Sequence, residues 1–304
     1  MKRALAAAAT IVLLALLANL VEWRALGGVF SRAHPAWLAP GCAIVLLFPL
    51  LNAARWQAAL EAVGVRMGFA ECLRVTMAVW PVGTLTPAKA GEFLKALAVR
   101  PGGTLGQGVG SALAERVVDV GVLGAFGAAF GLAAGSAPAA LAGAAALAAA
   151  LAAFGLARPL SRRFAAARPG KLAEKLLRLA EALPALARSP GCFARCAGAS
   201  ALNWFLSMLQ LWLLLRAFGA PSPLVLVVGV LPAATFAGLL PVTVAGAGTR
   251  DAALLALTHG AIDGPALLAA GVVYTLTGYF ALGVLGLPQL ARLRHRLAAE
   301  EHAP

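Results

Sequence analysis

Charged residues interrupt two apolar stretches of this chain, each beside proline and glycine. The first stretch contains Lys89, Glu92 and Lys95, and the second contains Arg250 and Asp251. Irregular backbone at membrane depth is tolerated only where it is buried in protein or lines a polar cavity. A charge at that depth is costly and usually serves a function. The two breaks therefore predict a site that binds a polar or charged ligand within apolar surroundings.

The first break is expected to start a short helix. Thr86 and Pro87 have the residue types of a helix N-cap and of the first helical position. Gly91 follows about one turn later, and Glu92 and Lys95 are spaced so that they can pair on one helix face. The sequence therefore predicts free backbone N–H groups at the break, with charged side chains just beyond them.

The second break, which begins at Pro241, is expected to start another short helix. Thr249 is predicted to cap this helix after the permissive backbone of Gly246 and Gly248. A helix N-terminus carries about half a positive charge and attracts phosphate or carboxylate groups. Both breaks place a basic residue within the first turn of their helix, which strengthens that preference. The alternative is that both are ordinary turns at the membrane interface.

Three charged residues occur within the apolar run of residues 106–134. Glu115 and Asp119 are four residues apart and share one helix face, and Arg116 lies beside them. An unpaired charge there would cost several kcal/mol, so partners on other helices are expected. The candidate partners are Lys89, Lys95 and Arg250. A polar groove or proton relay and a purely structural ion-pair network are both compatible with this arrangement.

The surroundings of these residues are those of a membrane protein. The chain is 61% hydrophobic and only 12% charged, with a mean hydropathy of +0.86. Soluble domains carry about 25% charged residues, and one soluble core could not bury this much apolar surface. Composition therefore predicts a polytopic membrane protein, folded as a single membrane domain over residues 1–304.

Six apolar segments approach the length of about 20 residues that a spanning helix requires. They are residues 4–22, 36–54, 106–134, 137–157, 196–217 and 266–287. Two further segments, residues 69–99 and 223–260, are too long for one span and are broken in the middle. The halves of the first contain about 13 residues each, which favours a re-entrant hairpin over two crossings. The predicted fold is an all-α polytopic membrane protein with about six spans and two broken re-entrant hairpins.

Basic residues indicate the orientation of these spans. Residues 158–195 contain nine Lys or Arg and two acids, and more basic residues lie at Lys2, at Arg3 and within residues 288–304. The positive-inside rule places all three regions in the cytoplasm. The sequence therefore predicts a multi-pass protein of the inner (plasma) membrane with both termini cytoplasmic. Topology explains the basic charge, so no nucleic-acid partner is expected.

This orientation places the two hairpins on opposite faces of the membrane. Broken helices that enter from opposite faces are typical of transporters built from inverted repeats, in which the breaks meet near the midplane. The connector over residues 158–195 has leucines at helical spacing among basic residues. It is expected to lie on the anionic inner leaflet or to form a solvated cytoplasmic helix, and residues 288–304 are expected to form a basic cytoplasmic tail.

Other polar and aromatic residues are expected to have structural roles. Arg55 and Trp56 follow the second apolar segment and have the types of interface anchors. The same role is expected for Trp23, Trp37, Trp80, Tyr274 and Tyr279. Asn52 and Asn203 lie inside apolar segments and are expected to form hydrogen bonds between helices.

Enzyme signatures are absent from the sequence. There is no nucleophile elbow, zinc-protease helix motif, Walker loop or dinucleotide fingerprint. The four cysteines follow neither a metal-binding nor a disulfide pattern. We therefore expect no enzyme activity, no metal and no cofactor.

Four motifs in this order resemble the lysylphosphatidylglycerol synthase transmembrane region, also called the flippase-like domain. They are Asn52-x-x-Arg55-Trp56, Pro87-x-Lys89-x-Gly91-Glu92-x-x-Lys95, Glu115-Arg116-x-x-Asp119, and Pro241 to Gly248-Thr249-Arg250-Asp251. The resemblance covers nearly the whole chain and implies lipid translocation. Bifunctional members of the family carry a separate soluble domain that aminoacylates the lipid. Only residues 288–304 follow the last apolar segment here, so aminoacyl transfer is not expected. Asp251 stands where many relatives have Glu, and Thr275 lies near an expected Arg.

These features together predict a lipid translocase that moves an amphiphile with an anionic or polar headgroup between leaflets. The expected substrate-binding residues are Thr86, Pro87, Lys89, Gly91, Glu92, Lys95, Glu115, Arg116, Asp119, Pro241, Gly246, Gly248, Thr249, Arg250 and Asp251. The alternative is a non-transporting membrane scaffold that recruits a lipid-modifying enzyme as its partner. A membrane-embedded lipid-modifying enzyme that uses Glu92 or Asp119 is a third possibility, but it would need a nucleophile or a metal set that the sequence lacks.

Overall fold

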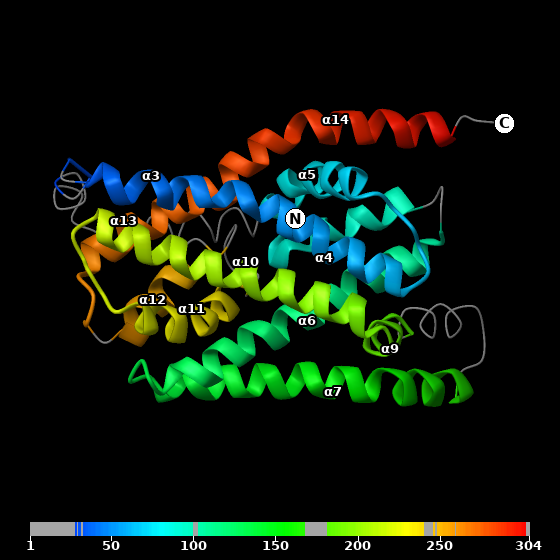
Figure 1. Ribbon diagram of the computed structural model, residues 1–304, viewed down its shortest axis with the longest axis horizontal. Coiled ribbons are helices and arrows are strands. Elements are labelled where there is room, and N and C mark those ends of the chain that lie inside the picture. The colour runs from blue at the N-terminus through cyan, green and yellow to red at the C-terminus, as the bar shows by residue number, and fades with distance from the viewer. Residues whose placement is uncertain are drawn as a thin grey trace, which may run out of the picture.

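The described part of the chain consists of helices joined by turns and loops and contains no strand, in agreement with the predicted all-α class. The structure is a computed structural model, which describes residues 28, 30–31, 33–99, 103–167, 181–239, 246, 248–258 and 260–301. Figure 1 shows long helices running side by side along the longest axis of the molecule. The predicted span over residues 4–22 lies outside the described residues.

Long apolar helices form the frame of the bundle. They are the rod of α3 (Pro35–Ala43), η1 (Ile44–Leu47) and α4 (Phe48–Ala62), then α6 (Leu105–Gly131), α7 (Ala137–Ala167) and α10 (Pro190–Ala217), and last the rod of α13 (Gly264–Thr275), η4 (Leu276–Ala281) and α14 (Leu282–Glu301). Within the described residues, four stretches are long and apolar enough to cross a membrane: Pro35–Ala62, Ala137–Pro159, Pro190–Ala217 and Gly264–Arg296. These four coincide with predicted spans, so the chain is a multi-pass membrane protein.

Helix α6 corresponds to the remaining predicted span within the described residues. It contains 27 residues, and a helix of that size is about 40 Å long, which exceeds the thickness of a bilayer core. It differs from the four apolar stretches because it carries Glu115, Arg116 and Asp119. Small residues line its contact with α7, where a Cβ on Gly127 would come within 3.1 Å of Gly143 Cα. The two backbones therefore pack closely, as small residues allow between membrane helices.

The first broken segment is a hairpin that returns to the end from which it starts. Its arms are α5 (Phe69–Leu85) and the 3₁₀ helix η2 (Pro87–Val99). Cys72 at the start of α5 and Val99 at the end of η2 share one buried cluster with Val65, which follows α4. The hairpin therefore begins and ends beside the C-terminus of α4, and its tip is at Thr86.

The second broken segment is also a hairpin. Its arms are α11 (Leu224–Gly238) and α12 (Thr249–Thr258), which pack on each other. Residues on both sides of the hairpin, Phe218 and Ile262, belong to the same buried cluster. The hairpin therefore begins and ends beside the C-terminus of α10.

The two hairpins enter the bundle from opposite ends. The His34 N–H before α3 donates to Ala217 O at the end of α10 over 2.9 Å, whereas Glu61 near the end of α4 pairs with Arg195 near the start of α10. The α3–α4 rod and α10 are therefore antiparallel. The hairpin beside the end of α4 and the hairpin beside the end of α10 face each other, and Figure 1 shows α5 to the right of α11 and α12.

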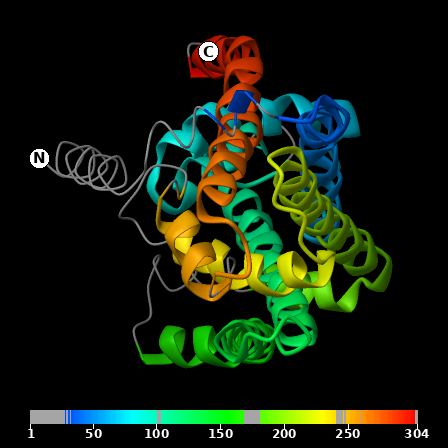
Figure 2. The ribbon, with the colours of Figure 1, turned by 90° about the vertical axis from the view of Figure 1, so that its left-hand side faces the viewer.

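One end of the bundle is rich in arginine. We call it the basic end, and it contains Arg66, Arg188, Arg195 and Arg296, each of which is exposed. Figure 2 shows α7 and α14 on opposite sides of the molecule. At the same end, Leu183 and Leu186 of α9 (Ala182–Arg188) are buried against α6 and α10. This part of the predicted connector therefore packs on the bundle, while residues 168–180 of the connector lie outside the described residues.

Candidate functional site

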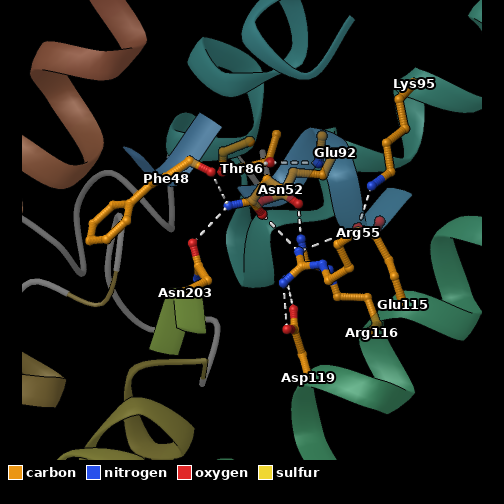
Figure 3. A network of polar contacts seen from close by, with 12 residues as sticks. Phe48, Asn52, Arg55, Thr86, Glu92, Lys95, Glu115, Arg116, Asp119 and Asn203 are labelled. Carbon is orange, nitrogen blue, oxygen red and sulfur yellow. Dashed lines mark hydrogen bonds and ion pairs between the residues drawn. The ribbon is translucent and has the colours of Figure 1, made fainter. Parts of the chain in front are cut away.

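A cluster of alternating charges joins α4, η2 and α6 in the interior of the bundle (Figure 3). Arg55 Nη1 on α4 donates to Asp119 Oδ1 on α6 over 2.5 Å, and Arg55 Nη2 lies 3.5 Å from Glu115 Oε1. Lys95 on η2 also donates to Glu115 Oε1. These four side chains are at most 7% exposed. Two bases therefore compensate two acids away from solvent, as the cost of a buried unpaired charge requires.

A second ion pair lies at the edge of this cluster. Arg116 on α6 pairs with Glu92 on η2, and its Nη1 lies 3.4 Å from Asp119 Oδ2. The side chains of Arg116 and Glu92 are 29% and 21% exposed, unlike those of the four buried residues. This pair is therefore the part of the charge cluster that a ligand can reach.

Helix α10 adds neutral hydrogen-bond donors to the cluster. Ser200 Oγ donates to Asp119 Oδ1 over 2.5 Å, and Trp204 Nε1 donates to the same oxygen over 3.0 Å. Asn52 Nδ2 donates to Asn203 Oδ1 over 3.1 Å, which confirms the predicted hydrogen bond between helices. Asp119 therefore fixes α10 to α6 as well as binding Arg55.

The predicted pairing of Glu92 with Lys95 is wrong. Each of these η2 residues pairs with α6 instead, Glu92 with Arg116 and Lys95 with Glu115. Pairing within η2 would leave Glu115 with Arg55 as its only base, so pairing between helices compensates more of the buried charge. Of the candidate partners considered for the α6 acids, Lys95 is one, Arg250 is not, and the side chain of Lys89 lies outside the described part of the chain.

The prediction that Arg55 and Trp56 are interface anchors is also wrong. Their exposed fractions are 2% and 0%. Trp56 Nε1 donates to Ser111 Oγ over 3.2 Å, and Lys95 Nζ lies 5.2 Å from the centre of its ring. The reason is that α4 continues to Ala62, beyond the predicted span, so both residues lie inside the bundle. The sequence contained a signal for this burial: Arg55 follows Asn52, a polar residue within an apolar segment, by about one helical turn.

The tip of the first hairpin is closed by a threonine hydroxyl. Helix η2 begins at Pro87 as predicted. An N-cap side chain normally accepts from the N–H two or three residues later, but Thr86 Oγ1 accepts from the Gly91 N–H, five residues later, over 2.7 Å. The same hydroxyl donates to Val82 O over 2.9 Å. Gly91 also packs directly on α5, where an added Cβ would lie 2.6 Å from the carbonyl carbon of Val82. The tip is therefore a tight turn that requires glycine at this position.

Replacing Gly91 by alanine is expected to destabilise the protein by about 1–3 kcal/mol, because the new methyl group would overlap the α5 backbone and push the arms of the hairpin apart. Thermal unfolding of the purified protein in detergent measures this. Gly155→Ala is the matched control: nothing lies within 4 Å of its Cβ position on α7, and alanine favours a helix interior. Equal melting temperatures for the two variants would contradict the tight packing of the tip.

The tip of the second hairpin is capped by Asp251 and not by Thr249. Helix α12 begins at Thr249, and the Gly248 N–H donates to Asp251 Oδ2 over 3.1 Å. Thr249 Oγ1 donates to Gly246 O over 3.3 Å instead. The predicted cap fails because Gly248, with a φ of 91° that favours glycine, occupies the position before the helix. Pro241 lies outside the described residues.

Arg250 is anchored within the second hairpin and by α13. Its Nη2 lies 2.7 Å from Asp251 Oδ1, 3.3 Å from Gly271 O and 2.9 Å from Thr275 Oγ1. Its guanidinium carbon lies 4.5 Å from the centre of the Tyr274 ring. The remaining nitrogen, Nη1, is buried and has no hydrogen-bond partner among the residues that the structure describes. Thr275, which stands near an expected arginine, therefore accepts a bond from Arg250 here.

The tips of both hairpins line one cavity of about 150 Å³, whose lining is mostly apolar but contains several charged side chains. Residues that line it include Thr86, Arg116, Asp119, Gly246, Arg250 and Tyr279. A smaller cavity of about 40 Å³ adjoins it and shares Arg116, Asp119, Trp204 and Tyr279. A single water requires about 10–15 Å³, so the larger cavity has room for several waters or for a group the size of a phosphate.

The predicted binding residues fall into distinct groups. Those that line the two cavities are Thr86, Glu92, Arg116, Asp119, Gly246 and Arg250. Lys95 and Glu115 lie behind the cavities in the buried charge cluster, while Gly91, Gly248, Thr249 and Asp251 shape the tips. Sequence reasoning missed Trp204, Thr235 and Tyr279 as lining residues. Tyr279 lies in the π-helical segment η4, for which the sequence gives no signal.

Apolar helices long enough to span a bilayer, two hairpins from opposite ends and a cavity between their tips define a polytopic membrane protein with an internal site. The family described as the lysylphosphatidylglycerol synthase TM region matches residues 3–286. The chain belongs to this family, which confirms the resemblance seen in the sequence. A comparison with curated proteins finds no match to the chain.

Proposed function

We propose that this protein is a lipid translocase, which moves an amphiphile with a polar or anionic headgroup between the leaflets of the inner membrane without changing it chemically. The observation that carries the proposal is that the tips of two opposed hairpins, at Thr86 and Gly246, line the same cavity, which Arg116 and Arg250 also line. Hairpins that meet between the two faces of a membrane are the arrangement by which inverted-repeat transporters form a substrate site.

The lining of the cavity suits a headgroup. Arg116 and Arg250 supply guanidinium groups, which bind phosphate and carboxylate in a bidentate manner. Glu92 and Asp119 compensate the charge of Arg116, and Asp251 compensates that of Arg250. A headgroup that contacts Arg116 would therefore exchange with Glu92, the partner that is already partly exposed to the cavity.

Apolar surface beside the cavity suits the lipid tails. Leu239 lines the cavity and is 39% exposed, and Leu85, next to Thr86, is 67% exposed. Lipid tails are as apolar as leucine side chains, so there is no hydrophobic driving force to bury leucine at a membrane-facing surface. Exposed leucine is therefore ordinary there. The acyl chains would remain in the bilayer at this surface while the headgroup passes through the polar interior.

A reconstituted flip assay tests the proposal. Vesicles contain the protein and phosphatidylglycerol or phosphatidylcholine with a fluorophore that is quenched only in the outer leaflet. The variant Glu92→Gln/Arg116→Gln removes both charges of the reachable pair and leaves the net charge unchanged. Its matched control, Glu61→Gln/Arg195→Gln, removes an exposed pair at the basic end, whose side chains are 32% and 53% exposed.

The wild type and the control variant are expected to scramble at least one of these lipids at similar rates. The cavity variant is expected to scramble it at least about tenfold more slowly, which corresponds to a loss of about 1.4 kcal/mol of transition-state stabilisation. Equal rates for the cavity variant and the wild type would show that the pair takes no part in transport. Rates no higher than in protein-free vesicles for every lipid headgroup tried would reject the translocase itself.

A further inference from the structure

A second polar cavity lies away from the hairpin tips, between α5 and α14 at the basic end. Its volume is about 170 Å³, and its polar lining residues are Glu71 and Arg74 on α5 and Gln289, Arg292 and Arg296 on α14. Figure 1 shows α14 running along α5 on the outer side of the bundle. We call this cavity the α5–α14 groove.

The groove carries an excess of positive charge. Three arginines and one glutamate line it, which gives a net charge of +2. Glu71 is shared between two bases: Arg74 Nη1 lies 3.3 Å from its Oε2, and Arg296 pairs with its Oε1. Arg292 has no ion-pair or hydrogen-bond partner among the described residues. The groove therefore carries more guanidinium charge than its single carboxylate neutralises.

The depth of the groove is that of lipid headgroups. On α14, Val284, Leu285 and Leu287 are 64%, 55% and 50% exposed, as expected for a lipid-facing surface. Gln289 and Arg292 follow directly, and five residues of helix correspond to about 8 Å. Exposed cations just beyond lipid-facing apolar side chains lie in the headgroup region.

The walls of the groove are held together by packing. Leu293 on α14 packs against the buried cluster that contains Cys72 and Val75 of α5. Two turns farther from the basic end, a Cβ on Gly286 would come within 3.0 Å of Pro81 Cδ, so the two helices are in close contact there as well. The arginines therefore project from a preformed surface, which lowers the entropic cost of binding a ligand between them.

We propose that the α5–α14 groove binds the phosphate group of an anionic lipid in the leaflet at the basic end. Arg74 and Arg292 would bridge the phosphate from opposite walls, and Gln289 can donate to it. Basic pockets between membrane helices on the positively charged side bind anionic headgroups by this chemistry. The site is separate from the hairpin cavity and does not depend on the proposed transport function.

A lipid bound in the groove would contact two elements that also reach the cavity between the hairpin tips, namely α5 and the α13–α14 rod. Thr84 Oγ1 near the other end of α5 lies 3.4 Å from Tyr279 O, and Tyr279 lines the hairpin cavity. A phosphate that bridges the two walls would hold these elements together at the basic end. A lipid bound in the groove would therefore act as a structural lipid that stabilises the first hairpin.

Lipid binding by the detergent-purified protein tests this proposal, with native mass spectrometry as the readout. The probes are phosphatidylglycerol, phosphatidylcholine and inorganic phosphate at equal concentrations. The variant Arg74→Gln/Arg292→Gln removes two guanidinium groups from the groove. The matched control, Arg162→Gln/Arg294→Gln, removes two exposed arginines at the basic end that do not line the groove. A third variant, Glu71→Gln, removes the competing carboxylate.

Phosphatidylglycerol is expected to bind the wild type and the control more tightly than phosphatidylcholine does, and to bind the groove variant about tenfold more weakly than the wild type. Glu71→Gln is expected to bind it more tightly than the wild type, a gain that misfolding could not produce. Equal phosphatidylglycerol binding by the wild type and the groove variant would overturn the site. Inorganic phosphate that competes fully at the same concentration would overturn the assignment to a lipid.

Discussion

Replacing Arg55 by methionine is expected to destabilise the folded protein by about 3–5 kcal/mol, the usual cost of removing one partner from a buried ion pair. Methionine keeps much of the length and apolar packing of the arginine stem. The loss therefore comes from Asp119, left with Arg116 at 3.4 Å and with neutral donors from α10, and from Glu115, left with Lys95 alone.

Denaturant or thermal unfolding in detergent, followed by circular dichroism, measures this effect. Arg195→Met is the matched control because Arg195 also pairs with a carboxylate, Glu61, but the two side chains are 53% and 32% exposed. An exposed pair contributes about 0–1 kcal/mol. The double variant Arg55→Met/Asp119→Asn is expected to regain part of the lost stability. Equal losses for Arg55→Met and Arg195→Met would show that the buried cluster does not stabilise the fold.

Replacing Arg250 by lysine is expected to slow lipid transport at least about tenfold although the positive charge is kept. The guanidinium group of Arg250 contacts Asp251, Gly271 and Thr275 together and lies over Tyr274. A lysine ammonium is a single point and cannot hold these groups and also face a ligand. The tip of the second hairpin would therefore lose the geometry that places a cation beside the cavity.

The flip assay described above measures the rate, and thermal unfolding of the same samples measures folding. Arg216→Lys is the control: Arg216 stacks on Trp37 and Trp212, with its guanidinium carbon 5.0 and 4.4 Å from the ring centres, and does not line either hairpin cavity. Its transport is expected to stay close to that of the wild type. Transport by Arg250→Lys at the wild-type rate would remove Arg250 from the proposed site.

Features that the bilayer imposes on any sequence could be predicted without the structure. Proline and glycine within long apolar segments predicted the two hairpins, because backbone that leaves a helix in lipid must be buried. The basic residues at the expected cytoplasmic ends predicted an arrangement in which the hairpins oppose each other. The need to compensate Glu115 and Asp119 predicted partners on other helices, and Lys95 is one of them.

Features that depend on which helices become neighbours could not be predicted in the same way. Arg55 is a partner of both acids only because α4 runs past α6 at that height. Asp251 caps α12 because the backbone at Gly248 turns its N–H toward it, a detail that residue types alone do not fix. Tyr279 reaches the cavity through a π-helical segment, a local change in helical repeat without a sequence signature.

The charge cluster also constrains the order in which the chain can enter the membrane. Lys95 and Glu115 are 20 residues apart, whereas Arg55 and Asp119 are 64 residues apart. A lone charge at the centre of an inserting helix costs about 2.5–3.5 kcal/mol on the translocon scale, so η2 and α6 are each poor substrates for insertion alone. The first hairpin and α6 are synthesised in succession and neutralise each other, so they are expected to insert into the membrane together. Their acids then pair with Arg55 of α4, which is synthesised before them.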